Sequence, residues 1–125
     1  MSEFQYREDL KRRTKTFALR IIRLCQSLPK TLEASVIGKQ LLRSGTSVAA
    51  NYRAACRARS NAEFHSKVSI VIEEADETLF WIELLQEAAI MNPELLQSLC
   101  QESEEIIKIM ATARKNSKKN PNNQS

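Results

Sequence analysis

The acidic residues and the single histidine are the side chains that could build a metal centre in this chain. Four carboxylates fall within one short stretch, namely Glu73, Glu74, Asp76 and Glu77. A di-metal site in a helical bundle needs Glu-x-x-His pairs and further carboxylates that face inward. His65 belongs to no such pair, and a helical wheel places the carboxylates on an outward face. We therefore predict no metal site.

The possible nucleophiles are isolated from one another. Cys25, Cys56 and Cys100 are far apart and lack metal-type spacing, which is typical of reduced, small apolar residues. A Cys-His catalytic pair would need His65 beside a cysteine, and nothing orients it there. The chain has only two glycines and no glycine-rich phosphate loop. We predict no catalytic residue, no bound cofactor and no enzymatic activity.

Charge is the feature that indicates a binding function. Residues 1–59 hold 13 Lys and Arg against 4 Asp and Glu, whereas residues 60–113 hold 2 against 11. One interpretation is that a basic helical hairpin packs against an acidic one, within or between subunits. The other is that the cations bind the phosphates of RNA or DNA. The candidate nucleic-acid-binding residues are Lys11, Arg12, Arg13, Lys39, Arg43, Arg53, Arg57 and Arg59.

Composition and periodicity predict that these residues lie on helices. Two glycines and three prolines are too few for a β protein with many turns. Helices are expected from about Glu3 to Leu28, from Leu32 to Arg59, from Ser60 onward, and from Pro93 to about Lys115. Short connections between four helices predict an all-α fold, an up-down-up-down antiparallel four-helix bundle over residues 1–115. Residues 116–125 are polar and basic, and we expect them to be disordered.

Local signals mark the ends of these helices. Pro29 ends the first helix because the residue before a proline is driven out of the α region. Ser60, followed by Glu63, predicts a capping box. Asn92-Pro93-Glu94 predicts another start, with an amide cap and a proline at the first helical position. Gly45, in mid-helix, costs about 1 kcal/mol relative to Ala and indicates that a neighbouring backbone comes close.

The third helix also carries features that predict self-association. From Leu79 to Leu85 it is apolar nearly all round, which is hard to bury within one small chain. Trp81 either stacks on a base or is buried at a subunit contact, with its indole N–H donating to a carboxylate, and its neighbours favour the contact. We therefore expect a homo-oligomer. The candidate interface residues are Gln40, Ser47, Asn51, Glu77, Trp81, Leu84 and Leu85.

The polar stripe of the second helix has two interpretations. Arg43 either binds a phosphate or pairs with Glu74 or Glu77 on the acidic third helix. Asn51 either reads a base or satisfies a backbone group where helices converge. We favour the structural role for Asn51 and for Ser47.

Two segments carry a resemblance to a known family that covers roughly residues 10–115. They are Gln40-Leu-Leu-Arg-Ser-Gly-Thr-Ser-Val-Ala-Ala-Asn51 and Glu73-Glu-Ala-Asp-Glu-Thr-Leu-Phe-Trp-Ile-Glu-Leu-Leu85. Both resemble the four-helix-bundle proteins encoded by intervening sequences in 23S ribosomal RNA genes. Those proteins are related to the accessory variability proteins of diversity-generating retroelements. Ala54 and Ala55 stand where many members have a Glu-Gly pair, so no role of that glutamate transfers to this chain.

The resemblance implies a bacterial, cytoplasmic protein that forms a ring-like homo-oligomer, expected to be a pentamer. Among the retroelement relatives it implies a basic surface that contacts nucleic acid and a reverse transcriptase. It implies no settled molecular function. The first ten residues lack an apolar secretory segment, and no apolar run approaches the roughly 20 residues of a membrane span. We accordingly expect no membrane association.

Overall fold

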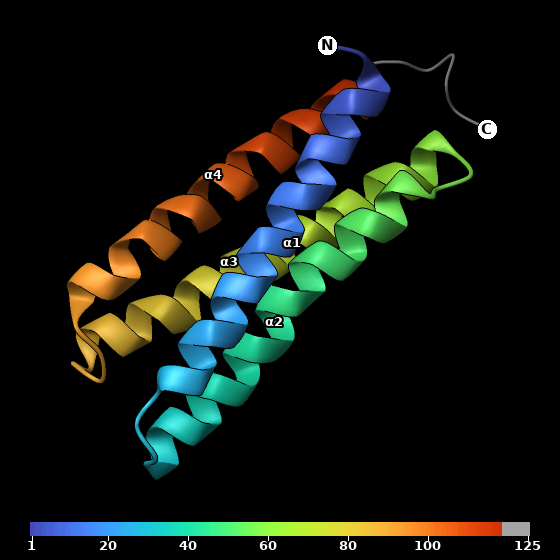
Figure 1. Cartoon of the computed structure of the whole chain (residues 1–125). Helices are drawn as coiled ribbons and strands as arrows, with labels where there is room; N and C mark the ends of the chain where they lie inside the picture. Colours follow the sequence, from blue (N-terminus) through green and yellow to red (C-terminus); the bar gives the residue numbers. More distant parts are fainter. Residues whose placement is uncertain (119–125) are drawn as a thin grey trace.

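The computed structural model describes residues 1–118 and contains four helices. They are α1 (Glu3–Ser27), α2 (Leu32–Cys56), α3 (Asn61–Glu87) and α4 (Pro93–Lys118). Each helix runs antiparallel to the one before it, and the four pack side by side (Figure 1). No strand occurs within residues 1–118. The prediction of an all-α four-helix bundle is confirmed. In this part of the chain no helix is long and apolar enough to span a membrane.

Side-chain caps begin the helices where the sequence indicates. Thr31 and Ser60 each accept a hydrogen bond from the backbone N–H three residues on, at 3.2 Å and 3.0 Å. The Asn92 side chain accepts from the N–H of Glu94 at 3.0 Å, just as Pro93 opens α4. Ala89 lies in the left-handed region, with φ of 54°, where the chain turns out of α3.

Two helix ends differ from the prediction. α2 stops at Cys56 and is capped by Arg57, so Arg59 lies in the connection to α3 rather than on the helix. α4 continues through Lys118 instead of ending near Lys115. The predicted disordered tail, residues 116–125, therefore overlaps the helix at its start, and the remainder lies outside the described residues.

One apolar stripe from each helix forms the core. Its largest fully buried side chains include Phe17, Ile21, Leu41, Val48, Tyr52, Val68, Val71, Ile82, Leu85, Leu96, Ile106 and Met110. On α3 the buried face is wide, because this helix packs along both α2 and α4. Leu85 is 0% exposed and belongs to the core of its own chain. This burial removes Leu85 from the candidate surface for contacts between subunits.

The helices differ in how extensively they pack against one another. The successive pairs pack along their length, whereas α1 and α4 contact each other sparingly. Figure 1 shows the α1–α2 and α3–α4 hairpins diverging toward the end that holds their tight connections. Polar contacts link α1 to α4: Arg13 pairs with Glu102, and Arg20 donates to Ser98 at 2.8 Å. The α1–α2 hairpin thus presents a long outer face that the rest of the chain does not cover.

Candidate nucleic-acid interface

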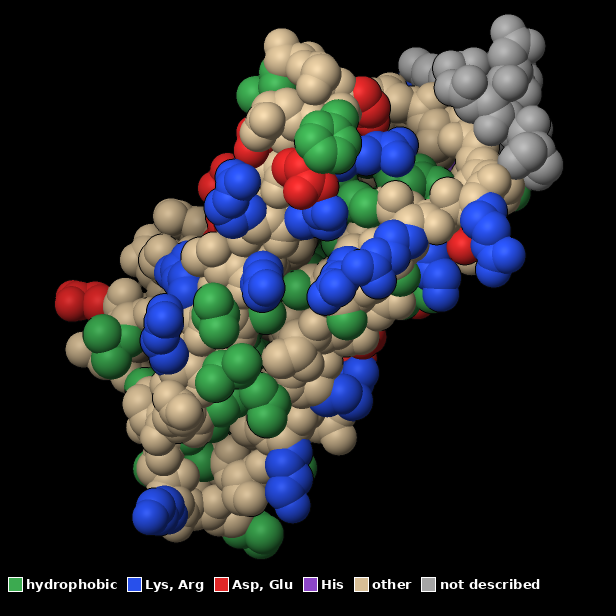
Figure 2. All heavy atoms as spheres, turned by 45° about the vertical axis from the view of Figure 1, so that its right-hand side comes forward, with side chains coloured by type: hydrophobic (Ala, Val, Ile, Leu, Met, Phe, Trp, Pro, Cys, Tyr) green, Lys and Arg blue, Asp and Glu red, His purple; other side chains and the backbone are tan. Residues whose placement is uncertain are grey.

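A groove runs between α1 and α2 on that outer face, and we call it the basic groove. Its volume is about 510 Å³, and it is lined by Glu8, Lys11, Arg12, Lys15, Ala49, Ala50, Arg53 and Arg57. α1 supplies three of the cations, α2 supplies Arg53, and the C-cap of α2 supplies Arg57. Ala49 and Ala50 leave open space between the two rows because their side chains are short. Figure 2 shows Lys and Arg side chains gathered over this face, with apolar side chains among them.

Most of the positive charge in the basic groove is available to a ligand. Lys11 pairs with Glu8 at 2.6 Å, and Arg12 pairs with Asp9 at 3.1 Å, each within one turn of α1. Such exposed pairs contribute little free energy and exchange readily. Within residues 1–118, Lys15, Arg53 and Arg57 take part in no ion pair. The groove therefore combines two weakly paired cations with three unpaired ones.

Arg13, which the sequence groups with these cations, points to α4 instead. Its Nε and Nη2 each lie 2.8 Å from a carboxylate oxygen of Glu102, and Nη2 lies 3.1 Å from Glu105. The hydrogen bond to Glu102 raises the pKa of the Arg13 guanidinium above its usual value. A bidentate pair of this kind satisfies the fork of the guanidinium. Arg13 therefore joins helices and does not line the basic groove.

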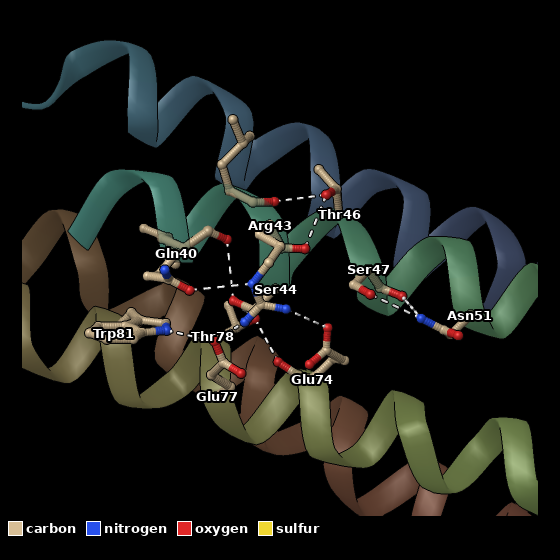
Figure 3. A network of polar contacts seen from close by, with 12 residues as sticks. Gln40, Arg43, Ser44, Thr46, Ser47, Asn51, Glu74, Glu77, Thr78 and Trp81 are labelled. Carbon is tan, nitrogen blue, oxygen red and sulfur yellow. Dashed lines mark hydrogen bonds and ion pairs between the residues drawn. The ribbon is translucent and has the colours of Figure 1, made fainter. Parts of the chain in front are cut away.

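Arg43 is also committed to partners within the chain. Its guanidinium donates to Glu74 at 3.1 Å and to Glu77, and its Nε donates to Gln40 at 3.3 Å. The indole N–H of Trp81 donates to the same Glu77 oxygen at 3.0 Å. Figure 3 shows these side chains converging between α2 and α3. Arg43 therefore forms the ion pair with Glu74 and Glu77, which is one of its two interpretations. Trp81 donates to a carboxylate as expected, but that carboxylate is Glu77 on its own helix.

Hydrogen bonds within the chain also occupy the polar residues that follow Arg43 on α2. Ser44 and Thr78 are buried and share a 2.9 Å hydrogen bond between α2 and α3. The Asn51 amide donates to the carbonyl and to the hydroxyl of Ser47, both at 2.9 Å. Both acceptors lie on α2 itself, so this contact stays within one helix and does not reach the backbone of a neighbouring helix. Figure 3 shows the Asn51–Ser47 contact beside the Arg43 network.

The Glu77 carboxylate makes the Arg43 network sensitive to acid. The hydrogen bond from Trp81, and then that from Arg43, lower the pKa of Glu77 below its usual value. A carboxyl whose pKa is lower in the folded state contributes stability above its unfolded pKa and loses it as the pH falls through the folded pKa. As the pH falls from about 6 to about 3, we therefore expect the free energy of unfolding to decrease less for Glu77→Gln than for the wild type. Urea denaturation across this range measures the difference.

Glu73→Gln is the matched control for this prediction. Glu73 is exposed, one turn away on the same helix, and forms no ion pair within the described residues. Its stability profile should follow that of the wild type. Identical acid profiles for Glu77→Gln and the wild type would show that the network does not contribute to the pH dependence.

The other candidate cations lie outside the basic groove. Lys39 lines a second hollow on the same α1–α2 face, together with Lys30, and we call it the lysine hollow. Arg59 is exposed in the α2–α3 connection, beside Ser60. Conversely, Lys15 lies in the basic groove although it was not among the predicted residues. The spacing of four from Lys11 on one helix could have identified it.

The cysteines and the carboxylates of residues 1–118 form neither a metal cluster nor an activated thiol. Within residues 1–118 no three His, Cys, Asp or Glu side chains are close enough to hold a metal ion. Burial raises the pKa of the Cys25, Cys56 and Cys100 thiols, which keeps them protonated and weakly nucleophilic. The basic groove is therefore the best-defined candidate site.

A four-helix bundle with a basic α1–α2 face is the class of protein that these features define. The model of the 23S rRNA-intervening sequence protein family matches residues 8–112, and the chain belongs to that family. The chain is also similar to the crystal structure of a protein of unknown function from the S23 ribosomal protein family of Bacteroides thetaiotaomicron VPI-5482. The two are 38% identical with a TM-score of 0.81, over 87% of this chain and 97% of that chain. The search of curated proteins found no match.

Proposed function

We propose that this protein is a non-enzymatic bundle that binds RNA or DNA through phosphates, using the basic groove. The observation that carries the proposal is the convergence of five cations from two helices on one open groove: Lys11, Arg12, Lys15, Arg53 and Arg57. Lys and Arg neutralise phosphates and release condensed counterions, which supplies most of the free energy of sequence-independent binding. Five cations in one groove can contact several phosphates of the same ligand at once.

The lining of the basic groove also favours binding without base specificity. Base edges are read by bidentate donors and acceptors such as Asn, Gln and Arg on an element that enters a DNA groove. Here Ala49 and Ala50 separate the rows of cations, and the nearby amide of Asn51 is bonded to Ser47. Contacts with phosphates position a ligand but carry no sequence information. We therefore expect similar affinities for unrelated sequences.

A fluorescence-anisotropy titration with a structured RNA at two salt concentrations tests this proposal. If about five phosphates are neutralised, the association constant should fall by about 10²- to 10³-fold between about 50 mM and about 200 mM salt. Binding that is tight at low salt and steeply salt-dependent would support the basic groove. Absence of binding even at low salt would contradict the proposal and would direct attention to protein partners.

We further propose that the chain forms a homo-oligomer, for which the family resemblance suggests a pentamer. The supporting feature is an apolar surface on α3 next to the Arg43 network. Phe80 is 49% exposed and meets the ring of Trp81 edge-on, with centroids 4.9 Å apart, and Leu84 is half-buried. Exposed aromatic side chains of this kind are enriched at the centres of protein interfaces.

The alternative function is a protein-interaction scaffold with no nucleic-acid role, in which the α1–α2 face docks an acidic partner or another subunit. Native mass spectrometry tests the part of Trp81 and Phe80 in assembly. We expect Trp81→Ala to reduce the oligomer to smaller species, because the large ring would be lost from the contact. Phe80→Ser should act in the same direction with less effect on the chain's own packing, since Phe80 is the more exposed. An unchanged mass for both variants would contradict this interface.

A further inference from the structure

We propose that the α1–α2 face binds a double-stranded nucleic acid in preference to a single strand. This inference rests on the nucleic-acid binding proposed above and specifies the ligand of the same face. Three features carry it. Neither hollow on the face contains an aromatic ring, positive charge occurs at two separated places, and the helices that hold the charges are closely fixed to each other.

The linings of the two hollows contain no aromatic side chain, which argues against a site for unpaired bases. Proteins that bind single strands combine a basic channel with aromatic rings on which successive bases stack. All seven aromatic residues of the chain fall within the described residues, and none lines the basic groove or the lysine hollow. Trp81, the best stacking side chain, is held between α2 and α3 by its bond to Glu77. A duplex, whose bases are already stacked, needs no such rings.

The two hollows lie far enough apart to contact separate phosphates of one rigid ligand. Lys39 in the lysine hollow and Arg53 in the basic groove are 14 positions apart on α2, which corresponds to about 21 Å along the helix axis. A duplex carries a phosphate about every 3.4 Å along each strand and holds these phosphates at fixed positions. The two hollows can therefore contact phosphates of one duplex at the same time. Leu42 lies between Lys39 and Arg53 on α2 and is 40% exposed, so the intervening surface is partly apolar (Figure 2).

Close packing keeps the two hollows at a fixed separation. Gly45 of α2 allows the helix to approach Ile21, and Gly38 approaches Leu28 near the end of α1. The Cys25 thiol lies 3.5 Å from the Gly38 carbonyl in the same seam. A rigid pair of charged sites suits a rigid ligand, because neither partner loses much conformational freedom on binding. A flexible single strand would have to be held extended to reach both hollows.

The test compares an RNA duplex of about 20 base pairs with an oligouridine that has the same number of phosphates, by fluorescence anisotropy at equal salt. We expect the duplex to bind at least about tenfold more tightly. Because a duplex also has the higher charge density, the geometry is tested by the variant Lys30→Glu/Lys39→Glu. It should weaken duplex binding by about tenfold and oligouridine binding by less than about twofold, because a flexible strand can contact the basic groove alone without being held extended to the lysine hollow. Lys108→Glu/Lys115→Glu, with the same charge change on the exposed side of α4, should leave the ratio of the two affinities unchanged.

The outcomes separate this inference from the proposed function. Equal affinity for duplex and oligouridine, or an equal loss of both in Lys30→Glu/Lys39→Glu, would overturn the duplex preference and leave phosphate binding intact. Failure of the wild type to bind either ligand at low salt would overturn the proposed function as well. A selective loss of duplex binding in the Lys30→Glu/Lys39→Glu variant would support the inference.

Discussion

Reversing one cation on each side of the basic groove, in Lys15→Glu/Arg53→Glu, is expected to weaken nucleic-acid binding by at least about 100-fold. Both residues line the groove, and neither forms an ion pair within residues 1–118. Their replacement therefore costs the folded chain little, yet it removes two phosphate contacts and adds two like charges. The slope of log K against log salt should become shallower by about 2. Anisotropy titrations at several salt concentrations measure both quantities.

The charge-matched variant Lys108→Glu/Lys115→Glu distinguishes a local site from a general effect of net charge. Both lysines are exposed on α4, away from the α1–α2 face. We expect this variant to lose affinity by less than about threefold, through long-range repulsion alone. Circular dichroism and native mass should be unchanged for both variants. If the groove variant binds as well as the wild type, the phosphates do not contact the basic groove.

The fold was predictable from the sequence because its signals are local. Ser60 and Asn92 cap helices at the positions that the sequence indicates, and Pro29 follows the end of α1. Short connections between four amphipathic segments then leave few arrangements other than an antiparallel bundle. The helix ends beyond Cys56 and Lys115 were placed less well, since no glycine or proline marks them.

The candidate site was predictable only in part, because it depends on how helices pair. Sequence alone identified Arg53 as a basic surface residue, but not that Lys15 would face it across the groove. The sequence indicates Glu74 and Glu77 as partners of Arg43, whereas nothing in it indicates that Arg13 reaches Glu102. That contact joins residues 89 positions apart, so no local sequence pattern predicts it. Only the packing of α4 beside α1 separates Arg13 from the cations that remain available to a ligand.

The close approach of α1 and α2, which shapes the whole basic face, depends on Gly45. A Cβ at this position would lie 2.8 Å from Cγ2 and 2.9 Å from Cγ1 of Ile21, a fully buried side chain that has no room to withdraw. We expect Gly45→Val to lower the free energy of unfolding by about 2 to 3 kcal/mol, because overpacking exceeds the gain in helix propensity. The melting temperature should fall by about 10 °C, as measured by circular dichroism.

Gly38→Ala is the natural control, because a Cβ there meets only the Cδ1 atom of Leu28, at 3.0 Å. Leu28 is half-buried at the end of α1, and the tip of its side chain can move aside. Alanine also favours a helix over glycine by about 1 kcal/mol, so this variant should be as stable as the wild type or more stable. Combining Ile21→Ala with Gly45→Val should cost less than the sum of the two single changes, since the contact between them is relieved. Additive losses would show that Gly45 is not required for the approach of α2 to Ile21, and that another contact sets the width of the basic groove.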